Sequence, residues 1–345
     1  MRAAMDRPGR PTIADVARLA GVHASTVSRA LDPAARHRIS AAVAERVSAA
    51  AEKLGYRPSA LAAGLRSGRS HTVGVLVPDL TNPVFPPIVQ AIEAALARAG
   101  YVTLLASTEA DPAKEALLIR RMAAQGADGI ILASATSGSP APEAALRLGL
   151  PMVLVNRRLP GTDLPAVVSE DAAGIGLAVR HLLGLGHRRI AHLAGPSGVA
   201  TAADRLRGFR AALRAAGLAP VAVERAAAYT RAAGGAAARA LLRAGGFTAI
   251  VAANDLLALG AYDALREAGL RVPVDVSVTG FNDMPMADLV DPPLTTVRIQ
   301  HAAMGEAAAS ALLARLRGEA PEGLTRLPAA LVVRESTAAP PGQAG

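Results

Sequence analysis

The sequence predicts an α/β core of two doubly wound subdomains, preceded by a small all-helical unit. Three observations lead to this fold class. Apolar residues repeat at helical spacing over the first 57 residues, strand-like apolar runs alternate with alanine-rich helical stretches from Thr72 onward, and a length of 345 residues favours two or three domains.

The N-terminal segment predicts three short helices. The first follows Thr12, which forms a capping-box pattern with Asp15. The second covers residues 24–31 and ends before a proline, and the third covers residues 41–54 with Ser40 as its expected N-cap. Three short helices in 57 residues indicate a compact helical unit.

The remainder alternates strands and helices. Strands are expected at 72–78, 101–107, 129–134, 151–156, 166–170, 189–195, 249–254 and 276–281. Continuous apolar strands separated by helices of ten or more residues are typical of a parallel sheet covered on both faces. Two such halves fit between residues 72 and 337, divided near residue 168.

The expected domains are therefore a helical headpiece, a linker, a two-part core and a disordered tail. Their ranges are 1–57, 58–71, 72–337 and 338–345, and the core divides into about 72–168 plus 297–325 and about 169–294 plus 326–337.

Positive charge is concentrated in the headpiece and linker. Residues 1–70 carry twelve basic and five acidic residues, so they hold +7 of the net charge of +9. Such asymmetry is the electrostatic pattern of a module that binds a polyanion, although a solvated basic surface gives the same count.

Other classes of protein are disfavoured by composition. There is no uncharged apolar run of 18 residues, no secretory-signal pattern at the N-terminus and no cysteine. We therefore expect a cytoplasmic protein with no membrane partner, no disulfide, and neither a metal nor a cofactor.

Residues 12–31 have the features of a helix-turn-helix. This motif needs a tight turn, a small apolar core and small polar side chains on the outer face of the second helix. Gly21 can form the turn, and the residues left outside are His23, Ala24, Ser25, Ser28 and Arg29. An arginine at the edge of the major groove most often reads guanine.

Longer motifs carry a specific resemblance. The strings TIADVARLAGVHASTVSRAL, LGYRPSALAAGLRSGRS, DRLRGF, AANDLLALGAYDALREAGLRVPVDVSVTGFND and PPLTTVRI together resemble the LacI/GalR (lac-repressor) family of bacterial transcription regulators over nearly the whole chain. The resemblance implies a homodimer on near-palindromic operator double-stranded DNA. It also implies a periplasmic-binding-protein-like core, with three crossovers, that closes around a small-molecule effector.

The resemblance further implies which residues meet DNA. Ala24 and Ser25 take the main base-reading positions, and the segment 59–66 is a hinge helix whose Leu65 enters the minor groove. An alternative for Leu65 is docking on the core. The full expected set is Thr12, His23, Ala24, Ser25, Thr26, Ser28, Arg29, Ala62 and Leu65.

Two features depart from the family pattern. His23 replaces the usual serine or threonine cap, and it either caps the second helix through its ring or reaches DNA. The basic stretch at 33–39 is longer than usual and provides either extra phosphate contacts or, slightly favoured, a solvated loop.

Candidate effector contacts follow strand ends, where α/β sheets bind ligands. They are Phe85, Asn156, Arg205, Tyr229, Asn254 and Asn282. The resemblance assigns Arg205 as the ligand-facing arginine and places Tyr229 near an aromatic lid position. Phe85 can stack on a ring, with a core position as the alternative.

Neighbouring polar residues have structural interpretations. Asp255 is expected to cap the following helix, and Arg157 can form a surface ion pair. Asn156 and Asn282 stand where the family more often has aspartates, so a polar effector read by amides is expected.

These features favour a ligand-responsive transcription regulator over three alternative functions. Because most members of such families are repressors, we expect a repressor. A periplasmic solute-binding protein would lack the headpiece. An enzyme is disfavoured because only a lone Gly-x-Gly (174–176) suggests a cofactor. A nonspecific architectural DNA binder would not need a ligand core.

Overall fold

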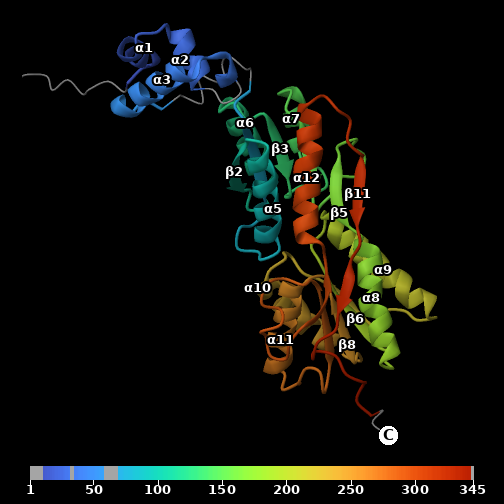
Figure 1. Ribbon diagram of the computed structural model, residues 1–345. Coiled ribbons are helices and arrows are strands. Elements are labelled where there is room, and N and C mark those ends of the chain that lie inside the picture. Colours follow the sequence, from blue (N-terminus) through green and yellow to red (C-terminus); the bar gives the residue numbers. More distant parts are fainter. Residues whose placement is uncertain (1–10, 32–34, 58–68, 343–345) are drawn as a thin grey trace, which may run out of the picture. The chain divides into compact units, whose positions relative to one another are not determined.

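The structure, a computed structural model, describes residues 11–31, 35–57 and 69–342 of the chain (Figure 1). The chain divides into two compact units, Met1–Ser70 and His71–Gly345.

The described residues of the first unit form three α-helices and one 3₁₀ turn. These are α1 (Ile13–Ala20), α2 (Ala24–Ala30), η1 (Arg36–Arg38) and α3 (Ala41–Leu54). Val16, Val27 and Val47 are fully buried at the centre, surrounded mainly by alanines. Small side chains let three short helices meet closely around a core of few large residues.

Helix capping matches the expectation at α1 but not at α3. Thr12 N–H donates to Asp15 Oδ2 (2.9 Å) and Asp15 N–H donates to Thr12 Oγ1 (3.4 Å), which completes the capping box. Gly21, at φ +62°, ends α1 in the left-handed conformation. Ser40 occupies the N-cap of α3, but its side chain makes no capping hydrogen bond.

The second unit contains two six-stranded sheets. The first has the order β11-β5-β4-β3-β1-β2 and the second β12-β10-β9-β8-β6-β7. The strands of the first sheet are β1 (Thr72–Val77), β2 (Val102–Ser107), β3 (Gly129–Leu132), β4 (Met152–Val155), β5 (Ala166–Ser169) and β11 (Leu324–Leu327). Those of the second are β6 (Ile190–Ala194), β7 (Val223–Arg225), β8 (Ala249–Ala252), β9 (Ser277–Asn282), β10 (Thr295–Arg298) and β12 (Ala330–Val332).

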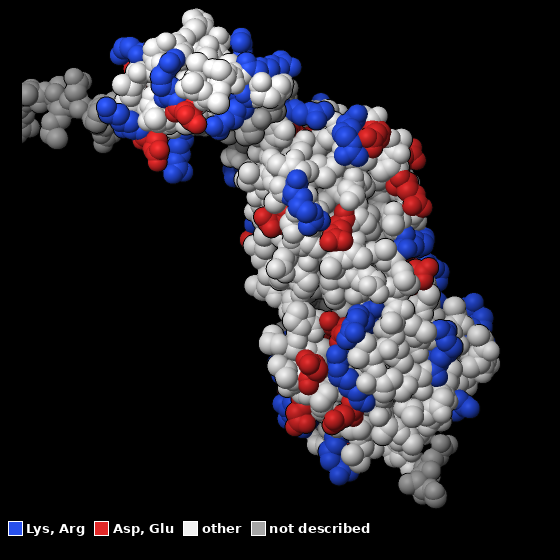
Figure 2. Space-filling view, viewed as in Figure 1, with Lys and Arg blue, Asp and Glu red and all other residues white. Residues whose placement is uncertain are grey.

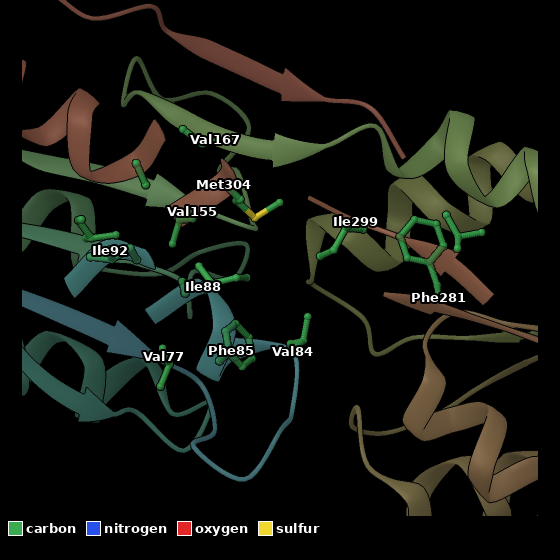
Figure 3. Packing of buried hydrophobic residues seen from close by; sticks show 14 of the residues in the cluster. Val77, Val84, Phe85, Ile88, Ile92, Val155, Val167, Phe281, Ile299 and Met304 are labelled. Atoms are coloured by element: carbon green, nitrogen blue, oxygen red, sulfur yellow. The ribbon is translucent and has the colours of Figure 1, made fainter. Parts of the chain in front are cut away.

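Helices cover both faces of each sheet. They are α5 (Phe85–Arg98), α6 (Pro112–Ala124), α7 (Ala141–Arg147), α8 (Asp171–Gly184), α9 (Ala200–Ala215), α10 (Arg231–Ala244), α11 (Asp255–Glu267) and α12 (His301–Leu316). Helices α5 and α12 pack with α8 and α9 into one apolar cluster that joins the two halves. Figure 3 shows Phe281 and Ile299 on the far side of this cluster from Phe85 and Met304.

The predicted doubly wound fold is confirmed, with four strands that sequence patterning missed. All paired neighbours are parallel except β10 and β12. The missed strands β7, β10, β11 and β12 have three or four residues each, and three of them lie at sheet edges. Short edge strands carry polar side chains and lack the continuous apolar run of a central strand.

The chain passes between the sheets three times. It crosses after β5, after β10 and after β11. The expected divisions were 168/169, 294/297 and 325/326, whereas the crossings fall near residues 170, 299–300 and 328–329. The largest difference arises because β10 pairs with β9 and so belongs wholly to the second sheet.

The expectation that the tail is disordered from residue 338 onward is wrong for its first residues. Ala338 N–H donates to Ser277 Oγ (3.0 Å), and the Ala338 carbonyl accepts a hydrogen bond from His187 Nε2 (2.8 Å). Pro340 is also buried. These are contacts with the second sheet, which the local Pro/Gly-rich sequence does not reveal.

The contact between α10 and α11 depends on glycine. A Cβ at Gly260 would lie 2.3 Å from the Arg231 carbonyl oxygen and 2.3 Å from the Gly235 nitrogen, both rigid backbone atoms. We expect Gly260→Ala to lower the free energy of unfolding by about 1–3 kcal/mol, measured by urea denaturation. The control is Gly184→Ala near the end of α8, where nothing lies within 4 Å and stability should stay equal or rise. Equal effects of the two changes would contradict this packing argument.

Burial of His192 gives a pH dependence. Its Nδ1–H donates to the Val251 carbonyl (2.7 Å), its ring stacks on Phe209, and burial lowers its pKa from 6.5 to about 4. Between these values the unfolded chain binds the proton more readily, so His192 makes stability fall as pH falls from 6.5 towards 4.

We expect wild type to lose about 2 kcal/mol more than His192→Leu between pH 7.5 and pH 5, measured by urea denaturation at both pH values. Asp255, whose pKa burial raises to about 7, acts in the opposite direction but is common to both proteins. An unchanged pH dependence in the variant would disprove the assignment to His192.

Candidate functional site

His23 begins the second helix of the headpiece. Its Nδ1 accepts a hydrogen bond from Ser25 N–H (3.3 Å) and lies 2.9 Å from Ser25 Oγ. Of the two roles open for His23, the structure therefore shows the cap. The ring replaces the hydroxyl that most often satisfies a free N–H at a helix N-terminus.

The outer face of α2 is small and polar. His23, Ser25 and Arg29 are exposed, whereas Val27 and Ala30 are buried against α1 and α3. The other expected contacts on this helix, Ala24, Thr26 and Ser28, are half-buried. A helix with short side chains and one terminal arginine can approach the edges of bases closely.

Charge on this unit is mostly positive. Figure 2 shows mainly Lys and Arg side chains on its surface, with few acidic ones. Within the basic stretch, Arg36, His37 and Arg38 form an exposed 3₁₀ turn. Thr12 is exposed, but its hydroxyl donates to Asp15 Oδ2 (2.7 Å). Ala62 and Leu65 lie outside the described residues.

The second unit contains a cavity at the carboxyl ends of its strands. Its free volume is about 20 Å³, and it is lined by Asn82, Val84, Phe85, Asn156, Arg157, Thr201, Arg205, Tyr229, Asn254 and Asn282. The structure therefore brings together all six side chains that the sequence nominated. They come from both halves. Phe85 and Asn156 follow β1 and β4 of the first sheet. Arg205, Tyr229 and Asn254 follow β6, β7 and β8 of the second sheet, and Asn282 ends β9.

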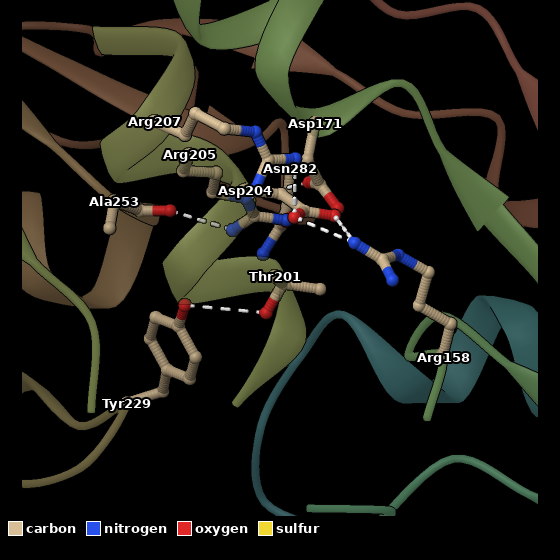
Figure 4. Close-up of polar contacts among 9 residues, drawn as sticks. All are labelled: Arg158, Asp171, Thr201, Asp204, Arg205, Arg207, Tyr229, Ala253 and Asn282. Carbon is tan, nitrogen blue, oxygen red and sulfur yellow. Dashed lines mark hydrogen bonds and ion pairs between the residues drawn. The ribbon is translucent and has the colours of Figure 1, made fainter. Parts of the chain in front are cut away.

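Arg205 links three of the segments that surround the cavity. Its Nε donates to Asp171 Oδ1 (2.7 Å), its Nη1 to the Ala253 carbonyl (2.6 Å) and its Nη2 to Asn282 Oδ1 (3.2 Å) (Figure 4). Its guanidinium carbon lies 3.8 Å from the centre of the Phe281 ring. Burial raises the pKa of Asp171, and the charge of Arg205 opposes that rise.

The expected helix cap at Asp255 is wrong. Asn254 occupies the N-cap of α11, where its Oδ1 accepts from Leu257 N–H (2.9 Å). Asp255 is buried and accepts from Met284 N–H (2.8 Å) and from the Thr296 hydroxyl. Burial raises its pKa to about 7. The carboxylate thus ties α11 to β10 and to the loop after β9.

Arg157 is not a surface residue, contrary to the interpretation as a surface ion pair. It is 6% exposed and its Nη1 donates to the Ser134 carbonyl (2.9 Å). Asn156 before it has φ +63°, a strained conformation that turns the chain where β4 ends. The local sequence could not show this burial, because the partner Ser134 lies 23 residues away.

Phe85 takes the core position that was the alternative for it. Phe85 is 2% exposed at the start of α5, where it belongs to the core and also lines the cavity. The hydroxyl of Tyr229 lies 3.4 Å from Thr201 Oγ1, on the first turn of α9. Thr201 was missed by the sequence, although its place four residues before Arg205 puts both on one helix face.

Among the described residues, no helix is long and apolar enough to cross a membrane, and no group of three or more His, Cys, Asp or Glu could hold a metal ion.

Two family models match this chain. Residues 12–59 match "Bacterial regulatory proteins, lacI family", and residues 179–337 match "Periplasmic binding protein-like domain".

Similar proteins extend the match over nearly the whole chain. The HTH-type transcriptional regulator MalR of Streptomyces coelicolor is 39% identical, covering 96% of this chain and 98% of its own. The structure of the lac repressor dimer bound to operator and the anti-inducer ONPF gives a TM-score of 0.85 at 30% identity, covering 95% and 99%. A complex of the transcriptional regulator CelR with cellobiose gives 0.73 at 34% identity, covering 95% and 100%.

These matches confirm the resemblance, and with it the exclusion of an enzyme. Regulators of this family are not enzymes. A solute-binding protein is excluded as well, because it would lack the DNA-binding headpiece that matches the family. The chain belongs to the lacI family of bacterial regulatory proteins and is a DNA-binding transcription regulator with a periplasmic-binding-protein-like effector domain.

Proposed function

We propose that this regulator is a repressor that binds a near-palindromic operator as a homodimer and is switched by a small polar, sugar-like metabolite. A cytoplasmic, nucleoid-associated location follows from that role. The observation that carries the proposal is the cavity, because ten residues from two halves of the core converge on it. A ligand held between two halves stabilises one closure state over another.

The outer face of α2 supports operator recognition. Ala24 and Ser25 are the proposed base-reading residues, with Arg29 at the end of the helix as the donor to a guanine or a phosphate. The remaining proposed DNA contacts are Thr12, His23, Thr26, Ser28, Ala62 and Leu65.

Exposed apolar side chains support a homodimer. The edge strand β2 leaves Val102 63% exposed and Leu105 43% exposed. An uncovered edge strand with large apolar side chains is a surface that proteins normally pair or cover. A second copy of the chain would cover it, in keeping with the dimeric lac repressor structure.

Cellobiose in the CelR structure supports a sugar-like effector. We assign its contacts to Phe85, Asn156, Arg205, Tyr229, Asn254 and Asn282. Such an effector changes DNA occupancy only by its different affinity for the two closure states, typically about 1–3 kcal/mol.

A gel-shift series on DNA from the gene's own upstream region tests operator binding. We expect specific binding that weakens steeply with salt, and Arg29→Ala should weaken it by about 1–3 kcal/mol because a base or phosphate contact is lost. The matched control is Arg18→Ala on α1, whose side chain is 79% exposed and pairs with Asp15. Sedimentation of the complex should give two chains per operator. Binding that ignores DNA sequence, and is equal for both variants, would contradict operator recognition.

A thermal-shift screen with cellobiose, ribose and nucleosides tests the effector cavity. The Asn156 side chain donates to no other described residue, and glycine tolerates its φ of +63°. We therefore expect Asn156→Gly to keep the ligand-free melting temperature and to lose the shift given by any compound that stabilises wild type. A ligand whose shift survives both Asn156→Gly and Arg205→Ala binds somewhere else.

A further inference from the structure

Arg157 is a buried cation with unused donors. It lines the cavity and is 6% exposed, and among the described residues it makes one hydrogen bond, from Nη1 to the Ser134 carbonyl. Its Nε is fully buried without a partner. An arginine remains charged in a protein interior, so burial without a counter-charge is costly.

The unused part of Arg157 is the edge formed by Nε and Nη2. The same edge holds carboxylates elsewhere in this chain. Arg231 donates from Nε and Nη2 to the two oxygens of Asp263 (2.6 and 2.7 Å), and Arg271 does so to Asp275 (2.9 and 3.2 Å). Two parallel N–H groups match the spacing of two carboxylate oxygens. The free edge of Arg157 therefore has the geometry of a carboxylate site.

The nearby carboxylates are held by other groups. Asp171 binds Arg205, Asp204 binds Arg158 and Arg207, and Asp283 binds Arg298 and Arg334.

Glu115 connects to Arg157 only through Ser134. The hydroxyl of Ser134 donates to Glu115, while its carbonyl accepts from Arg157. Glu115 also accepts from Ser139, and no direct ion pair between Glu115 and Arg157 forms. The charge of Arg157 is thus compensated only at a distance.

The remaining polar groups of the cavity are mainly donors. Asn254 and Asn282 use their Oδ1 atoms to accept from Leu257 N–H and from Arg205, so their NH₂ groups remain to donate. No carboxylate is among the described residues that line the cavity. A neutral sugar offers as many hydroxyl donors as acceptors. The side chains that line this cavity mainly donate, so they match a ligand with more acceptors than donors.

We infer that the effector is a small polyhydroxylated carboxylate, of the aldonate or uronate type, whose carboxylate binds the Nε–Nη2 edge of Arg157. Because the cavity has a free volume of about 20 Å³ and Nε is buried, the two halves of the core must move apart to admit this ligand. This inference rests on the proposed role of the cavity as the effector site. The amide donors of Asn254 and Asn282 serve the hydroxyl oxygens, and the face of Phe85 lies against the carbon skeleton.

Calorimetric titration and operator gel shifts with glucose, gluconate, glucuronate and glucose 6-phosphate test this inference. We expect the two carboxylates to bind wild type more tightly than glucose and glucose 6-phosphate and to change operator affinity. Arg157→Gln should weaken carboxylate binding by roughly 10- to 100-fold, and Arg157→Lys, which keeps charge but not the two-pronged edge, should fall between.

Stability provides a second readout. Because Arg157→Gln removes a buried cation that has no direct counter-charge, the ligand-free variant should melt at the wild-type temperature or above it, whereas loss of a merely structural arginine would lower the melting temperature. The matched control is Arg147→Gln on α7, whose side chain is 71% exposed and which should leave binding unchanged.

The outcomes separate the two hypotheses. If glucose binds as tightly as its acids, the carboxylate inference is wrong while the effector cavity stands. If wild type binds glucose 6-phosphate most tightly, the carboxylate inference is also wrong, and the group that Arg157 binds is a phosphate. If none of the four compounds binds, the carboxylate inference fails, and the independent screen with cellobiose, ribose and nucleosides then decides on the cavity itself.

Discussion

The arrangement of the effector domain depends on the hydrogen bonds of Arg205. This buried guanidinium joins the start of α8, through Asp171, to the end of β8, through the Ala253 carbonyl, and to the end of β9, through Asn282. Its flat face rests on Phe281. One planar cation thus fixes three carboxyl-end segments around the cavity, and the partial compensation by Asp171 makes its burial tolerable.

Small residues bring the helices close enough for this arrangement. Only 2% of the residues are aromatic, so large side chains do not fill the spaces between helices. Instead, Gly208 on α9 faces the Ala172 backbone of α8, and Gly305 on α12 faces the Ile88 carbonyl of α5. A Cβ at either position would come within 2.4 Å of a backbone atom. The helices therefore pack by close backbone approach rather than through large side chains. This packing positions Phe85, at the start of α5, at the cavity.

The cavity differs in electrostatic character from what a neutral ligand needs. Two guanidinium groups and several amides line the cavity. The donors of Arg205 are bound to protein partners, as are the carboxylates of Asp171 and Asp255, so Arg157 is the guanidinium group with unused donors. Asparagines at positions 156 and 282 contribute to this balance, because an amide can donate where a carboxylate cannot. The same substitutions that make a sugar held by carboxylates less suitable make an acceptor-rich effector more suitable.

The sequence alone determined the fold class, the helix-turn-helix and the six cavity residues first nominated. The fold class and the helix-turn-helix depend on periodicity and glycine positions, which are local along the chain. The capping box of Thr12 is an example, since both partners lie within one helical turn. Arg205 and Tyr229 were assigned by the resemblance of longer motifs to a known family. Only the tertiary structure decided the roles of Asp255 and Arg157 and the anchoring of Ala338. Their partners Met284, Thr296, Ser134 and His187 are 23 to 151 residues away. Burial and pairing of a polar side chain are set by segments that meet only after folding, so no local pattern could specify them.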